Sequence, residues 1–180
     1  MTTHNNEYNA VAKTLHWLLA ILICAEWMVG ATLDTTSWYW LHFQTGALIF
    51  VLVVARIVWK VVAGHPPMDD SLTALNKLGA TLGHSVLYLL MLFVPVLGLV
   101  LVFTHGEPIS LLGIPFPAFV DQPWPHATRH MIKEIHEAGA FGLVMLAIAH
   151  GLVAIVHYIR HKSILGRMVP RCIMNLIEKK

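Results

Sequence analysis

Three histidines share one face of a single apolar stretch, residues 134–160. On an α-helix, the 14 residues between His136 and His150 bring both rings to within about 40° of one direction, roughly 21 Å apart along the axis. His157 lies within about 20° of the direction of His150 and roughly 10 Å further along. A polar ring in an apolar helix is costly unless it has a partner. The spacing therefore predicts that these imidazoles bind something, and imidazole is a common metal ligand.

The composition indicates where such a helix lies. Of the 180 residues, 57% are hydrophobic and only 12% are charged, and the mean hydropathy is +0.66. These values exclude an ordinary soluble domain and favour the lipid bilayer, rather than a nucleic acid, as the partner of the chain. The twelve histidines are unusually many. The two cysteines, Cys24 and Cys172, lie far apart and form no Cys-x-x-Cys-His motif, which excludes covalent attachment of a haem.

Four apolar stretches are long enough to cross a hydrocarbon layer of about 30 Å. They cover about residues 14–33, 41–62, 78–103 and 134–159. The first stretch is too long for the core of a cleaved signal peptide, so we expect it to be retained. We find no repeat or second domain, and we predict one all-α membrane domain over residues 1–180, a four-transmembrane-helix bundle. The long Pro- and Gly-rich link before the last helix is apolar enough to fold back over the end of the bundle.

The basic residues predict the orientation of this bundle. Only Arg129 and Lys133 fall on one side of the predicted membrane, whereas ten of the twelve Lys and Arg residues fall on the other. By the positive-inside rule, both termini are then cytoplasmic. The ten are Lys13, Arg56, Lys60, Lys77, Arg160, Lys162, Arg167, Arg171, Lys179 and Lys180.

Depth in the membrane decides which histidines can meet. His42 and His136 each lie within about two residues of the outer end of a helix, so one iron could be bound between them. His16 and His150 lie about 26 and 24 Å from the outer ends of their helices and form a second matched pair. Two imidazoles that fill both axial positions suit an electron-transfer haem. We therefore predict two non-covalent haem groups, stacked across the membrane.

Two histidines remain near the inner interface. His84 lies about 28 Å from the outer end of its helix, at the level where His157 is also expected. They are either alternative haem ligands or the lining of a second small-molecule site.

Other polar side chains allow two readings. Arg56 either anchors the cytoplasmic side of its helix or reaches the propionates of the inner haem. Glu26 is either a polar contact inside the bundle, which we favour, or part of a proton path. His126 and His130 have the spacing of two zinc ligands on a helix, but two ligands do not make a site.

Arg129 and Lys133 also allow two readings. They either cap the outer end of the fourth helix or form a positively charged mouth that attracts small anions toward the outer haem.

The chain resembles the bacterial cytochrome b561 family of small di-haem inner-membrane proteins over nearly its whole length. The matching segments are Leu15-His16-Trp17, His42 with Gly46, Leu82-Gly83-His84, Tyr88-Leu89-Leu90, Pro95-Val96-Leu97-Gly98-Leu99-Val100, Lys133, His136-Glu137, His150, His157-Tyr158 and Leu165-Gly166-Arg167-Met168-Val169-Pro170-Arg171.

The resemblance implies two b-type haems, one bound by His16 with His150 and one by His42 with His136. It implies that His84 and His157 belong near a quinone site. The best-understood member of the family is a superoxide oxidase that passes electrons from superoxide through its haems to ubiquinone, and Lys133 at the outer face of this chain fits an entrance for an anion.

We therefore expect an oxidoreductase of the bacterial inner membrane that passes electrons from an outer donor, superoxide, to ubiquinone near His84 and His157. One alternative is a haem subunit that relays electrons between a partner redox protein and quinone. The other is a haem-free transporter whose histidines move metal ions or protons.

Overall fold

Four long helices form the described part of the chain. The computed structural model describes residues 8–64, 66–67, 73–161 and 167–169. The helices are α1 (Ala10–Ala31), α2 (Tyr39–Ala63), α3 (Ala74–Phe103) and α4 (His126–His161). Each is long and apolar enough to cross a membrane, which confirms the four predicted spans.

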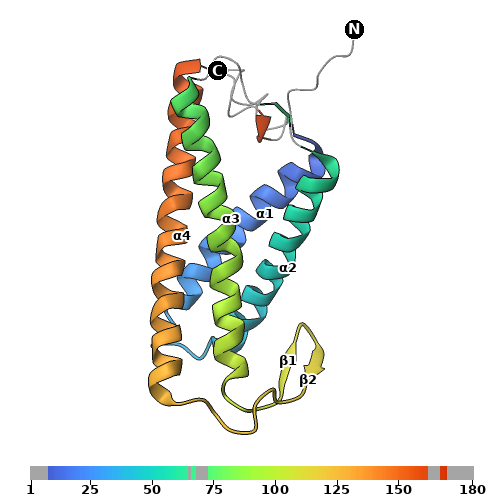
Figure 1. The fold of residues 1–180 in the computed structure, drawn as a ribbon, viewed down its shortest axis with the longest axis vertical. Helices are drawn as coiled ribbons and strands as arrows, with labels where there is room; N and C mark the ends of the chain where they lie inside the picture. Colours follow the sequence, from blue (N-terminus) through green and yellow to red (C-terminus); the bar gives the residue numbers. More distant parts are fainter. Residues whose placement is uncertain (1–7, 65, 68–72, 162–166, 170–180) are drawn as a thin grey trace.

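The helices pack as a bundle whose two ends differ (Figure 1). Helix α3 lies against both α2 and α4, while α1 packs mainly on α2 and also touches α4. The start of α1 and the end of α4 lie at one end, which we call the terminus end. The links between α1 and α2 and between α3 and α4 lie at the other, which we call the hairpin end.

Local signals in the sequence set the helix starts. The side chain of Asn9 accepts a hydrogen bond from the backbone N–H of Ala12 and caps α1, and Thr73 caps α3 in the same way. Helix α4 begins at His126, eight residues before the predicted start. The backbone carbonyl of Pro125 accepts hydrogen bonds from the first turn. We missed this part because its first turns are polar, and hydropathy alone does not separate a polar helix end from a loop.

A short β-hairpin in the link between α3 and α4 is an addition to the predicted all-α architecture. Strands β1 (Ile109–Leu111) and β2 (Ile114–Phe116) pair antiparallel. Leu112 and Gly113 have φ values of 50° and 84°, as a two-residue hairpin turn requires. The Gln44 side chain of α2 donates to the carbonyl of Ser110 and accepts from the N–H of Leu112, at 2.6 and 2.7 Å.

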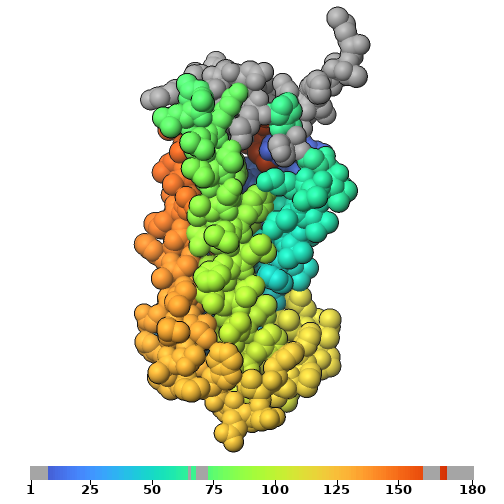
Figure 2. All heavy atoms as spheres, in the orientation of Figure 1, coloured from blue at the N-terminus to red at the C-terminus, as the bar shows by residue number. Residues whose placement is uncertain are grey.

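The outer surface of the bundle suits lipid. The small packed core contains Leu19, Ile49 and Val53, and many large apolar side chains point outward, such as Ile21 and Val61, which are 65% and 78% exposed. In the space-filling view, α3 forms a ridge between α4 and α2, and the link between α3 and α4 covers the hairpin end, as expected (Figure 2).

A short described piece of the C-terminal tail returns to α1 at the terminus end. Val169 is buried, and its carbonyl accepts a hydrogen bond from Lys13 Nζ at 3.2 Å. The indole N–H of Trp17 donates to the carbonyl of Met168 at 3.0 Å. Lys13 is therefore a buried tail contact as well as a basic residue of this end. Several of the basic residues used to predict the orientation lie outside the described residues or have side chains outside them, namely Arg160, Lys162, Arg171, Lys179 and Lys180.

Candidate cofactor sites

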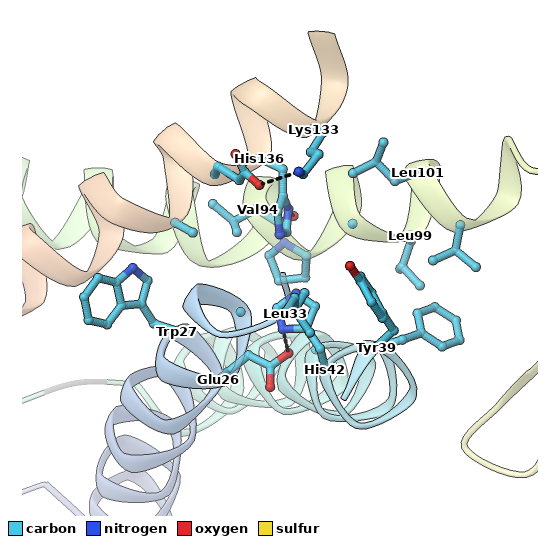
Figure 3. A pocket seen from close by; sticks show the side chains of 18 of the residues that line it. Glu26, Trp27, Leu33, Tyr39, His42, Val94, Leu99, Leu101, Lys133 and His136 are labelled. Carbon is cyan, nitrogen blue, oxygen red and sulfur yellow. Dashed lines mark hydrogen bonds and ion pairs between the residues drawn. The ribbon is translucent and has the colours of Figure 1, made fainter. Parts of the chain in front are cut away.

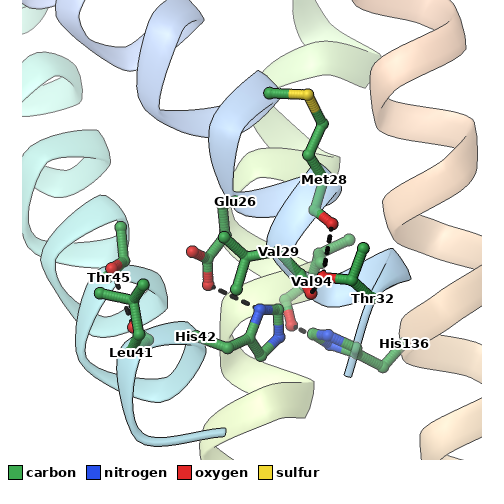
Figure 4. A network of polar contacts seen from close by, with 9 residues as sticks. All are labelled: Glu26, Met28, Val29, Thr32, Leu41, His42, Thr45, Val94 and His136. Atoms are coloured by element: carbon green, nitrogen blue, oxygen red, sulfur yellow. Dashed lines mark hydrogen bonds and ion pairs between the residues drawn. The ribbon is translucent and has the colours of Figure 1, made fainter. Parts of the chain in front are cut away.

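The histidines predicted to pair near one end of the bundle do lie together. His42 of α2 and His136 of α4 face each other at the hairpin end, with ring centroids 6.1 Å apart and ring planes at 90°. The two side chains come from different helices and meet across the interior of the bundle (Figure 4). We call this pair the hairpin-end site.

A preformed cavity surrounds the hairpin-end site (Figure 3). Its volume is about 850 Å³, within the range of about 300–1,000 Å³ that is typical of ligand and cofactor sites. Two glycines let the imidazoles lie close to backbone. A Cβ atom on Gly30 would lie 3.0 Å from Cε1 of His42, and one on Gly98 would lie 3.2 Å from Cε1 of His136. We did not identify this role of Gly30 and Gly98 from the sequence.

The Nδ1 atoms of both rings have oxygen neighbours. His136 Nδ1 is 2.9 Å from the carbonyl oxygen of Val94 in α3. His42 Nδ1 is 2.9 Å from Oε1 of Glu26 in α1, although the contact is not an aligned hydrogen bond. Oxygen acceptors at Nδ1 favour the tautomer that carries its proton there and leave Nε2 free for a metal. Glu26 is thus a polar contact inside the bundle, as favoured from the sequence.

The predicted cationic residues lie at the rim of the same cavity. Both Arg129 and Lys133 line it. Lys133 Nζ lies 3.4 Å from Oε1 of Glu137, and both side chains are more than half exposed. Arg129 Nε donates to the carbonyl of Trp124 at 3.1 Å. Each cation therefore has an oxygen partner at the mouth.

The zinc alternative gains no further ligand. The rings of His126 and His130 are 6.1 Å apart, and His130 Nε2 lies 3.6 Å from Oε1 of Glu134. Among the described residues, no group of three or more His, Cys, Asp or Glu side chains is placed to hold a metal ion.

A second cluster, the terminus-end site, contains three imidazoles. The ring of His150 in α4 lies 6.3 Å from that of His16 in α1, at an interplanar angle of 74°. The ring of His84 in α3 is closer still, 5.0 Å from that of His150. Its Nδ1 lies 2.7 Å from the carbonyl of Ala80 in the same helix. The depth in the membrane predicted that His84 lies level with His157. In the structure His84 meets His150 instead, and His157 is half-buried two turns beyond His150 on α4.

A cation occupies the terminus-end site. Nη2 of Arg56 lies 3.0 Å from Nδ1 of His16, and its Nε donates to the hydroxyl of Tyr88 at 3.2 Å. Lys60 Nζ lies 4.7 Å from the centroid of the Tyr88 ring. Arg56 therefore points into the bundle and is not a surface anchor alone.

The contact between Arg56 and His16 has a consequence for metal binding. A guanidinium has no acceptor, so Nδ1 of His16 must accept the hydrogen bond. In a neutral ring the proton is then on Nε2, the nitrogen that an iron would need. His16 can bind a metal through Nε2 only after the guanidinium has moved away from Nδ1.

The spacing of both pairs fits a bound haem iron. Two imidazoles on opposite faces of one iron, with bonds of about 2 Å, hold their ring centroids about 6 Å apart. The separations of 6.1 Å for His42 and His136 and 6.3 Å for His16 and His150 match this value. The hairpin-end site fits without rearrangement of its Nδ1 contacts, whereas the terminus-end site fits once Arg56 has moved.

Known proteins resemble the chain over nearly its full length. A family model described as prokaryotic cytochrome b561 matches residues 7–171. Cytochrome b561 homolog 1 of Escherichia coli strain K12 is 30% identical over 92% of this chain and 98% of its own length. Homolog 2 of the same strain is 28% identical over 90% of each chain. The probable superoxide oxidase CybB of Yersinia pestis is 24% identical over 93% of this chain and 98% of its own.

The match covers all four helices and every histidine of the two clusters. The chain belongs to the prokaryotic cytochrome b561 family, whose members bind haem b and transfer electrons in membranes.

Proposed function

We propose that the protein is a di-haem superoxide:ubiquinone oxidoreductase of the bacterial inner membrane. The observation that carries this proposal is the presence of two facing imidazole pairs at opposite ends of one bundle, each with the spacing that suits an iron. His42 and His136 would hold one haem b, and His16 and His150 the other. Haem iron supplies reversible one-electron chemistry when it is bound. The family assignment speaks against the haem-free transporter, because the family binds haem b.

We infer from the expected orientation of the bundle that the donor reacts at the hairpin end. The bias of basic residues toward the terminus end favours cytoplasmic termini by the positive-inside rule. Arg129 and Lys133 line the cavity that leads to His42 and His136, and cations at a cavity mouth raise the local concentration of a small anion. Superoxide is such an anion, and its oxidation to oxygen releases one electron and no proton.

The acceptor would bind at the terminus end. Two superoxide anions, one ubiquinone and two protons give two oxygen molecules and one ubiquinol. His84 and His157 both lie toward this end of the bundle, and an imidazole can carry a proton because one ring nitrogen can accept while the other donates. Once a haem is bound, we expect the guanidinium of Arg56 to leave His16 and contact the propionates, which are the anionic groups of the cofactor.

One observation favours a second candidate, a relay subunit that takes electrons from a partner protein. Both rim cations already have oxygen partners, namely Glu137 for Lys133 and the carbonyl of Trp124 for Arg129. This weakens their pull on a free anion, which a relay that takes electrons from another protein would not need. The relay would need no substrate site of its own.

Stopped-flow absorbance tests the proposal directly. Purified protein with ubiquinone is mixed with a pulse of superoxide, and haem reduction is followed with time. The His136→Ala variant should lose the hairpin-end haem and with it the fast phase. The matched control is His130→Ala, which removes an exposed histidine from the same cavity and should keep the parent rate.

Three outcomes separate the candidates. Fast reduction in the parent and loss in His136→Ala support the proposed route. A parent rate that survives in His136→Ala contradicts entry at the hairpin end. A protein that binds both haems, does not react with superoxide and purifies with a stoichiometric redox partner is the relay.

A further inference from the structure

A carboxylate lies inside the hairpin end of the bundle. Glu26 is on α1, five residues before the end of that helix, and its side chain is only 12% exposed. Both carboxylate oxygens are buried and, among the described residues, have no aligned hydrogen bond. An ionisable side chain in a membrane helix is costly and marks a functional position.

The surrounding helices make room for this carboxylate. A Cβ atom on Gly46 of α2 would lie 3.3 Å from Oε1 of Glu26, which is tighter than usual for such a contact. Gly30, on the same helix as Glu26, leaves the corresponding space for the His42 ring. The result is a 2.9 Å approach between Glu26 Oε1 and His42 Nδ1 (Figure 4).

The facing imidazole has a different neighbour. His136 Nδ1 meets the carbonyl oxygen of Val94, which is neutral. One pair of imidazoles thus has a carboxyl oxygen of Glu26 2.9 Å from Nδ1 on one side and a hydrogen-bonded backbone carbonyl on the other. Packing alone does not require this difference, because a glutamine at position 26 would fill a similar volume.

We propose that Glu26 is a positioning residue for the hairpin-end haem, which holds His42 through Nδ1 and makes the midpoint potential of that haem more negative. The inference rests on the proposed binding of one iron by His42 and His136. A carboxylate that accepts the Nδ1 proton of a ligand imidazole fixes the ring and increases its donor strength. A negative charge in a low-dielectric interior also stabilises the oxidised iron, which is the more positive state.

Redox titration of the full-length protein tests this role. The absorbance of both haems is followed against ambient potential in the parent and in Glu26→Gln, which keeps an oxygen acceptor but removes the charge. We expect both haems to stay bound and one potential to rise. At fixed ambient potential, the reduced-to-oxidised ratio of that haem should increase about tenfold, which is about 59 mV for one electron. Its low-spin electron paramagnetic resonance signal should shift as well.

Asp34→Asn is the matched control. Asp34 lines the same cavity but is exposed, so water screens its charge, and the ratio should change less than twofold. Unchanged potentials in Glu26→Gln, with both haems bound, would overturn the inference.

A second variant covers the case in which Glu26→Gln does not assemble. Glu26→Asp keeps the charge but withdraws it by one methylene from His42, so we expect a smaller rise in the same potential. No rise in Glu26→Asp would then overturn the inference. Failure of the proposed function looks different: the parent would lack a hairpin-end haem, or His42→Ala would still bind two haems.

Discussion

The two histidine clusters differ in the charge that lies against them. At the hairpin end, His42 approaches the carboxylate of Glu26 and His136 a backbone carbonyl. At the terminus end, His16 receives a hydrogen bond from the guanidinium of Arg56, and a third imidazole, His84, is present. At the first site, both Nδ1 atoms face an oxygen and a cavity surrounds the rings, so the proposed binding of an iron needs no change in these contacts. The second must rearrange before His16 can bind one.

We expect the difference in charge to set the direction of electron transfer between the two proposed haems. A buried anion stabilises an oxidised iron and a buried cation stabilises a reduced one. We therefore expect the hairpin-end haem to have the lower potential, so that electrons pass from it to the terminus-end haem. This is the direction that the proposed oxidation of superoxide and reduction of ubiquinone requires.

The sharpest test of the comparison concerns the third imidazole, and it has the largest expected effect. His16→Ala should remove the terminus-end haem and halve the haem content per chain, as measured by the pyridine hemochrome assay. His84→Ala should leave two haems bound, because the proposed role of His84 is proton delivery and not haem binding. Loss of this role should slow the reduction of ubiquinone at least about tenfold. His84 is nearer to His150 than His16 is, so loss of a haem in His84→Ala would reassign the ligand.

A smaller effect is expected from the cation. Arg56→Gln should lower the potential of the terminus-end haem and change its reduced-to-oxidised ratio by several fold, because a positive charge that stabilises the reduced iron is lost. Arg56→Lys keeps the charge and is the matched control. Redox titration measures both. A fall in the potential of the hairpin-end haem instead would contradict the assignment of Arg56 to the other site.

The smallest effect on the haems is expected from two glycine substitutions, which change the packing but no charge. Gly98→Ala adds a methyl group 3.2 Å from His136 Cε1, and overpacking of this kind costs about 1–3 kcal/mol. Thermal unfolding should show a lower Tm. In Gly142→Ala, where the added Cβ atom meets nothing within 4 Å, helix propensity should raise stability by up to about 1 kcal/mol. Equal Tm changes in the two variants would show that the space at Gly98 does not matter.

Much of this architecture could be predicted from the sequence. Hydropathy located the four spans, and helical rise placed His42 level with His136 and His16 level with His150. The terminus-end contacts could not be predicted in this way. Depth gives the height of a side chain but not the rotation of its helix, and the rotation decides that His84 meets His150 and that Arg56 points inward.

The hairpin-end details depended on distances shorter than sequence patterns resolve. Glu26 could be assigned to the interior, but its 2.9 Å approach to His42 depends on two glycines on different helices. The β-hairpin was missed because its strands have three residues each, too few to show an alternating pattern.

Helix α4 supplies a histidine to both sites, His136 to one and His150 to the other. The distance between the two sites along α4 is therefore fixed by the rise of a single helix. A thinner or thicker bilayer can tilt that helix, but it cannot stretch it. We expect the rate of electron exchange between the two haems to be insensitive to the lipid in which the protein is reconstituted.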